Sequence, residues 1–120
     1  MTEIRNSKQY DLEERTFKFT KDVIKFVKNL PKDIANIEII KQLIRASGSV
    51  GANYIEANEA LSKKDFVMRV KICRKEAKES RYWLKLIEVN GENAENQRQL
   101  LVQEATELMK IFDAILEKTK

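Results

Sequence analysis

Lysine and arginine side chains gather in one stretch of this sequence, and they are the residues best suited to do chemistry. Residues 63–85 contain nine basic and three acidic residues, which gives a local charge of +6 in a chain whose net charge is +4. Because lysine and arginine neutralise phosphate groups, such a stretch favours binding to a nucleic-acid backbone. The residues expected to make these contacts are Lys64, Lys71, Arg74, Lys75, Lys78, Arg81 and Lys85.

A solvated face is the alternative interpretation, because acidic residues three or four positions away can pair with some of these cations. The spacings that allow such pairs join Asp65 with Arg69, Lys75 with Glu79, and Lys85 with Glu88. They leave no partner nearby in the sequence for Lys64, Lys71, Arg74, Lys78 and Arg81. These cations suit an acidic protein as well as a nucleic acid, so both partners stay open.

Patterns typical of catalytic and metal-binding sites are missing from the sequence. It contains no histidine, which removes the usual general base near neutral pH, histidine-activated nucleophiles and the commonest metal ligand. The one cysteine, Cys73, falls on an apolar helix face and is expected to be a buried, inert thiol. We therefore expect no catalytic residue, no metal and no cofactor, and we keep a carboxylate-based hydrolase as a distant alternative.

Two of the three glycines, Gly48 and Gly51, lie in the segment ASGSVGANY at residues 46–54. A phosphate loop needs a longer glycine spacing, a following lysine and a preceding strand, and the segment has none of these. A G-x-x-G nucleic-acid clamp belongs to a fold with its own sheet. Kept in a helix, two glycines cost about 2 kcal/mol relative to alanine. Close packing against a helix of the same bundle or of another subunit would offset that cost.

We expect Gly48, Gly51 and three further residues, Asn53, Glu56 and Trp83, to take part in packing or in an oligomer interface. Asn53 and Glu56 lie beside the small-residue groove, one turn apart, and we expect hydrogen bonds between helices there. Trp83 lies beside an apolar seam, and we expect it to be half-buried and to pack, in preference to stacking on a base.

Four helices are expected from the recurrence of apolar residues at spacings of three and four. Asp11 and Ser62 are the expected N-caps of the first and third helices. Gly91 can adopt the left-handed conformation that ends the third. The expected ranges run from Asp11 to Pro31, from Ile34 or Asn36 to Leu61, from Ser62 to Gly91, and from near Asn93 onward.

Each expected helix has one apolar seam, and short connections between long helices make neighbours antiparallel. We therefore expect an all-α, antiparallel up-down-up-down four-helix bundle, with an extended coiled coil as the rival. Residues 1–120 would form a single domain, of which residues 1–10 would be a flexible N-terminal segment. The expected seam residues are Leu12, Thr16, Phe19, Val23, Phe26 and Leu30; Ile40, Leu43, Ser47, Val50, Tyr54, Ala57 and Leu61; Phe66, Val70, Cys73, Ala77, Ser80, Leu84 and Ile87; and Leu101, Ala105, Leu108, Phe112 and Ile115.

The sequence also bears on the cellular compartment. Its first residues are polar and lack the apolar core of a signal peptide, and no stretch approaches the length of a membrane span. A single cysteine cannot form an internal disulfide. We therefore expect a cytoplasmic protein that does not partner a membrane.

A series of motifs runs along most of the chain. A small-residue segment at 49–52 precedes an Asn-x-x-Glu-Ala step at 53–57, and Ser-Lys-x-Asp-Phe follows at 62–66. Further on come Lys-Glu-Ala at 75–77 and Tyr-Trp-Leu at 82–84, with NLPKD at 29–33 and LMKIFDAI at 108–115. Together they resemble the 23S ribosomal-RNA intervening-sequence protein family, also called the four-helix-bundle protein family.

The resemblance implies a bundle that assembles into a ring-like homopentamer and has no catalytic activity. Relatives in diversity-generating retroelements are accessory proteins whose basic ring contacts a reverse transcriptase and nucleic acid. For this chain, the resemblance therefore implies three kinds of partner: other copies of itself, RNA or DNA, and a reverse transcriptase or another acidic protein.

Overall fold

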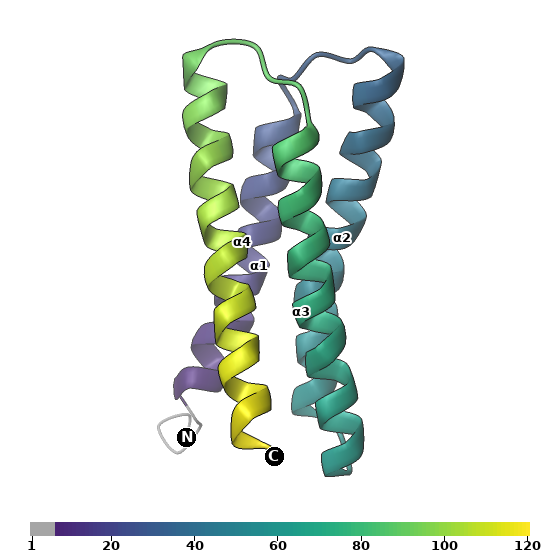
Figure 1. The fold of residues 1–120 in the computed structure, drawn as a ribbon, viewed down its shortest axis with the longest axis vertical. Helices are drawn as coiled ribbons and strands as arrows, with labels where there is room; N and C mark the ends of the chain where they lie inside the picture. Colours follow the sequence, from purple (N-terminus) through teal and green to yellow (C-terminus); the bar gives the residue numbers. More distant parts are fainter. Residues whose placement is uncertain (1–6) are drawn as a thin grey trace.

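The computed structural model describes residues 7–120, with side chains from residue 12 onward. Four helices run through this part of the chain: α1 (Ser7–Val27), α2 (Ile34–Asn58), α3 (Lys63–Leu86) and α4 (Glu92–Lys118). They alternate in direction, so that α1 starts and α4 finishes at the same end of the molecule (Figure 1). Each helix packs against the next, and α4 returns to α1. The expected four-helix bundle is confirmed, and the rival coiled coil is excluded.

The expected apolar seams form the core of the bundle. All the seam residues of the first helix are buried, and the seam of α3 is buried from Val70 to Ile87. In α4, Leu116 is buried, whereas the expected Ile115 only packs against the edge of the core. Each helix buries one side, and within the described residues no helix is long and apolar enough to cross a membrane.

The start of α1 differs from the expected one. The helix begins at Ser7, four residues before Asp11, so Asp11 lies inside the helix and is not its N-cap. Residues 7–10 contain neither proline nor glycine, and nothing in them prevents the helix from extending backwards. The expected flexible segment therefore overlaps α1 at residues 7–10, and its residues 1–6 lie outside the described part.

The end of α1 is closed by a lysine side chain. The helix stops at Val27, four residues before Pro31. The ammonium of Lys32 donates hydrogen bonds to the carbonyl oxygens of Val27, Lys28 and Leu30, at 3.2, 3.0 and 2.8 Å. The Lys32 ammonium thus provides hydrogen bonds to carbonyl groups that lack a partner at the end of a helix. This stabilises an end of α1 that lies before Pro31.

The remaining helix ends follow the expected chemistry, with two corrections. The Oγ of Ser62 accepts a hydrogen bond from the amide of Asp65 at 3.1 Å and so caps α3 as expected. Leu61 is 99% exposed, because α2 ends three residues before it, and it is not a seam residue. Gly91 has the expected positive φ, 102°, but at the start of α4 and not at the end of α3.

Asn36 fastens the two loops at the end of the bundle opposite the start of α1 (Figure 1). Its buried amide nitrogen donates to the carbonyl oxygens of Pro31 and Glu88, each at 3.0 Å. Its amide oxygen accepts from the backbone N–H of Glu88 at 2.8 Å. One side chain thereby joins the α1–α2 connection to the α3–α4 connection.

The glycine segment stays helical inside α2, as expected, and α1 of the same bundle packs on it. A Cβ atom at Gly51 would lie 3.2 Å from Oγ1 of Thr16, whereas the nearest contact at Gly48 is Cγ2 of Thr20 at 3.9 Å. The Thr20 hydroxyl donates a hydrogen bond to the carbonyl oxygen of Ser47 at 2.8 Å. The small residues of α2 therefore form a notch that brings α1 close.

The two glycines of this notch should respond differently to alanine. Gly48→Ala is expected to raise the free energy of unfolding by about 1 kcal/mol, because alanine favours the helix and the added Cβ has room. Gly51→Ala should gain less, because its Cβ presses on Thr16. Urea denaturation of both variants beside the unaltered protein measures the difference. Equal stabilisation would show that α1 does not approach Gly51 this closely.

Candidate nucleic-acid interface

Burial of one side of α3 sets the direction in which its cations point. Each residue is turned by about 100° from the one before it, so a residue that follows a buried seam position lies beside the core side. The fully buried seam residues are Val70, Cys73, Ala77, Ser80 and Leu84. The cations that follow them are Lys71, Arg74, Lys78, Arg81 and Lys85.

Four lysines spaced seven residues apart form a line along the exposed side of α3. We call Lys64, Lys71, Lys78 and Lys85 the lysine row. Each step of the row advances about 10 Å along the helix axis. All four side chains are exposed, and none makes an ion pair with another described residue. The expected pair of Lys85 with Glu88 does not form, since α3 ends at Leu86 before Glu88 is reached.

The two arginines of the expected interface are bound to α4. Arg74 pairs with Asp113 at 2.9 Å, and Arg81 donates a hydrogen bond to Oγ1 of Thr106 at 3.2 Å. The neighbouring sequence offers neither arginine a partner, and the partners that the structure shows come from α4. They attach α3 to α4 and are less available to a phosphate than the lysine row.

An open groove of about 440 Å³ lies between α3 and α4 beside the lysine row. It contains three cations and one carboxylate, and that carboxylate, Asp113, is already paired with Arg74. A phosphate in this groove would meet Lys78 directly and would compete with Asp113 for Arg74. The lining residues are Arg74, Lys75, Lys78, Met109 and Asp113.

Of the other expected pairs within α3, one forms and one does not. Lys75 lies 3.6 Å from Glu79, four residues on, as expected. Arg69 does not pair with Asp65, because its guanidinium donates to Oδ1 of Asn53 in α2 at 2.9 Å. Cations on both sides of the lysine row are thus bound to other residues, whereas the lysine row itself is unpaired.

Asn53 joins α2 to α3, in agreement with the expected hydrogen bond between helices. While its amide oxygen accepts from Arg69, its amide nitrogen donates to the carbonyl oxygen and the Oγ of Ser49, each at 2.9 Å. The side chain of Glu56, in contrast, is exposed and makes no hydrogen bond or ion pair to any described residue. The expected bond between helices is therefore wrong for Glu56, whose side chain faces solvent.

Glu76 is a buried carboxylate whose burial the apolar spacing of α3 does not predict. It lies 3.7 Å from Arg45 of α2 and 4.0 Å from Lys75. Within the described residues, Oε1 of Glu76 and Nε1 of the half-buried Trp83 have no hydrogen-bond partner. The available signal was the position of Glu76 three residues after Cys73, beside the buried seam, but the charged run around it masked that signal.

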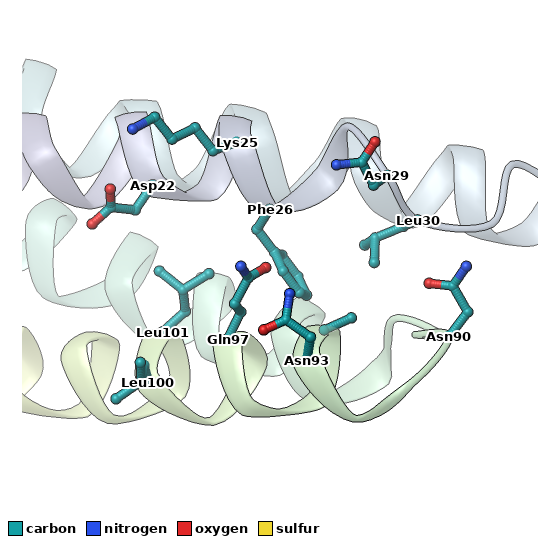
Figure 2. Close-up of a pocket in the computed structure, with 11 residues that line it drawn as sticks. Asp22, Lys25, Phe26, Asn29, Leu30, Asn90, Asn93, Gln97, Leu100 and Leu101 are labelled. Carbon is teal, nitrogen blue, oxygen red and sulfur yellow. The ribbon is translucent and has the colours of Figure 1, made fainter.

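A second groove, of about 630 Å³, opens between α1 and α4 near the loops (Figure 2). Its apolar lining includes Phe26, Leu30 and Leu101, and its amides belong to Asn29, Asn90, Asn93 and Gln97. Its one carboxylate, Asp22, pairs with Lys18 at 2.7 Å. This lining offers apolar contact and hydrogen bonds, and its charged groups are Asp22 and Lys25 of α1.

Cys73 lies in the core, where its Sγ donates a hydrogen bond to the carbonyl oxygen of Val50 at 3.4 Å. Burial raises the pKa of the Cys73 thiol to about 12. The thiol is therefore protonated and unreactive near neutral pH. In the part of the chain that the structure describes, no group of three or more histidine, cysteine, aspartate or glutamate side chains could hold a metal ion.

Comparison with known proteins identifies a protein family and related solved structures. The sequence model of the family described as 23S rRNA-intervening sequence protein matches residues 8–114. A crystal structure of a protein of unknown function from the S23 ribosomal protein family of Bacteroides thetaiotaomicron is similar, with a TM-score of 0.73 and 30% sequence identity. The match covers 87% of this chain and 96% of that one. No curated protein matches the chain significantly.

Burial of Cys73 should make stability fall in alkali. The unfolded thiol ionises near pH 9, whereas the folded thiol resists ionisation up to about pH 12. The contribution of the neutral thiol to the free energy of unfolding is thus fully present below pH 9 and is lost as the pH rises toward 12. The free energy of unfolding falls by at most about 1.4 kcal/mol for each pH unit. Urea denaturation across this range should show a steeper fall for the unaltered protein than for Cys73→Ala. Parallel curves would contradict the burial of the thiol.

Proposed function

The chain belongs to the 23S rRNA-intervening sequence protein family, and from this premise we propose that it is a non-enzymatic helical bundle that binds RNA or DNA. The observation that carries the proposal is the lysine row, four exposed ammonium groups without an acidic partner among the described residues. Binding of such groups to phosphates releases condensed counterions, which drives association. The proposed compartment is the cytoplasm, where a lone cysteine such as Cys73 stays reduced.

The regular spacing of the lysine row favours a nucleic-acid backbone over an acidic protein. The row repeats about every 10 Å over about 30 Å, so it fits a partner whose charges also repeat along a line. An acidic protein would match the row only where a helix carries carboxylates at the same seven-residue spacing. Arg74, Lys75 and Arg81 flank the row and would add contacts if phosphates displaced their present partners. An acidic protein, including a reverse transcriptase, is the alternative partner.

Self-association is the second part of the proposal, and exposed apolar side chains support it. Phe17 and Ile24 flank the side of α1 that touches α2, and Ile44 and Ile55 flank the matching side of α2. With Ile37, these side chains make an apolar strip on the outside of the α1–α2 pair, which a second copy would cover. We propose the ring-like homopentamer that the family resemblance implies, in which five lysine rows would act together.

Neutralising two members of the lysine row should weaken nucleic-acid binding and reduce its dependence on salt. Lys71→Ala with Lys78→Ala removes two phosphate contacts, so the slope of log affinity against log salt should fall by about 1 to 2. Titration of a labelled RNA hairpin at several salt concentrations measures this slope. The matched control is Lys28→Ala with Lys41→Ala, which removes the same charge from the turn after α1 and from α2.

Equal losses in the lysine-row variant and its control would show that only the net charge matters and would remove the row from the proposal. An absence of RNA and DNA binding at low salt would overturn the nucleic-acid part. Retention of an acidic protein from a lysate treated with nuclease would then favour the alternative partner.

A charge placed in the apolar strip should dissociate the assembly. Phe17→Glu puts a carboxylate where the side chain is 66% exposed in the single bundle, and burying that charge between copies would cost several kcal/mol. Light scattering after size-exclusion chromatography should give an oligomer for the unaltered protein and a monomer for this variant. Leu100→Glu, at a side chain of α4 that is 68% exposed, should keep the oligomer. A monomeric unaltered protein would contradict self-association.

A further inference from the structure

Tyr82 is an exposed aromatic residue set among the lysines of α3. Its side chain is 59% exposed, although a tyrosine ring usually gains free energy from burial. Lys78 precedes it by four residues and Lys85 follows it by three, so both lie on the adjacent turns of the same face. Within α3, all of which the structure describes, the other aromatic residues are the half-buried Phe66 and Trp83. Tyr82 is therefore the aromatic ring that α3 offers to a partner.

The ring of Tyr82 is held in place by Trp83. The two ring centroids are 5.0 Å apart and the ring planes are inclined at 75°, a T-shaped contact. Trp83 packs against the core, which fixes the position of its own ring. A T-shaped contact covers at most one face of the tyrosine ring. At least one face of Tyr82 thus stays open between two unpaired ammonium groups.

We infer that Tyr82 stacks on an unpaired base and gives the lysine row a preference for single-stranded nucleic acid. The inference rests on the proposed function, because the lysine row must first bring a strand to α3. With phosphates bound at Lys78 and Lys85, a base between them would lie over the Tyr82 ring. Stacking of this kind tolerates any sequence, since every base has a π face.

The geometry separates single strands from duplexes. In a duplex, each base is covered on both faces by its neighbours, so Tyr82 could reach a base only by unstacking it, which costs a few kcal/mol. A duplex would then contact the cations alone. A single strand would contact the cations and Tyr82 together, and its affinity would include the stacking contribution.

Binding of labelled oligo-uridine and of an RNA duplex of equal length tests this inference. Tyr82→Ala should weaken binding of oligo-uridine about tenfold and leave binding of the duplex unchanged. Tyr82→Phe keeps the ring and should bind both RNAs as the unaltered protein does. Leu86→Ala is the matched control, because it removes an aliphatic side chain of similar exposure, 50%, one turn further along α3. It should also leave both affinities unchanged.

The outcomes distinguish this inference from the proposed function. If Tyr82→Ala changes neither affinity while Lys71→Ala with Lys78→Ala weakens both, the proposed function holds and the stacking role of Tyr82 is wrong. The same conclusion follows if Tyr82→Ala weakens both RNAs equally, or if Leu86→Ala matches its effect. If neither RNA binds the unaltered protein at low salt, both fail. Circular dichroism melts of each variant show whether a loss of binding reflects unfolding.

Discussion

Burial of the α3 seam is the constraint on which the surface of the protein depends. Full burial of a valine, leucine or isoleucine side chain contributes about 1.5–3 kcal/mol, and this seam buries Val70, Leu84 and Ile87 in that way. Repulsion between neighbours in the lysine row, about 10 Å apart in water, amounts to about 0.4 kcal/mol before salt screens it. Hydrophobic burial therefore outweighs the repulsion that it creates. The lysine row is held in place by the core and not by its own contacts.

The four helices divide the outer surface into faces of different character. The α1–α2 pair packs closely at the notch around Gly51 and bears the apolar strip on its outer face. The α3–α4 pair bears the lysine row and the open groove beside it. The α3–α4 pair lies in front of the α1–α2 pair in Figure 1, so the outer faces of the two pairs point in different directions. A copy seated on the apolar strip would leave the lysine row accessible, so self-association and nucleic-acid binding are compatible.

Periodic features of the fold could be predicted from the sequence, whereas contacts between distant segments could not. The seams, the cap at Ser62 and the unbroken helix through Gly48 and Gly51 follow from local spacing. Arg74 pairs with Asp113, thirty-nine residues away, and Asn36 donates a hydrogen bond to Glu88, fifty-two residues away. Neither contact can be predicted from the local sequence pattern. Leu61 fits the seam spacing but lies beyond the end of α2, and periodicity alone does not show where a helix ends.

Arginine and lysine have separate roles in this bundle, and the division explains why the lysine row is available. Every arginine in the described part of the chain donates a hydrogen bond to a residue outside its own helix; the six are Arg15, Arg45, Arg69, Arg74, Arg81 and Arg98. The planar guanidinium suits such links, since it presents several donors in a fixed geometry. The ion pairs of the described lysines, in contrast, join residues at most four positions apart, as in Lys18 with Asp22 and Lys75 with Glu79. Arginines thus join the helices, and the flexible, strongly hydrated ammonium groups of the lysine row remain free to follow a phosphate backbone.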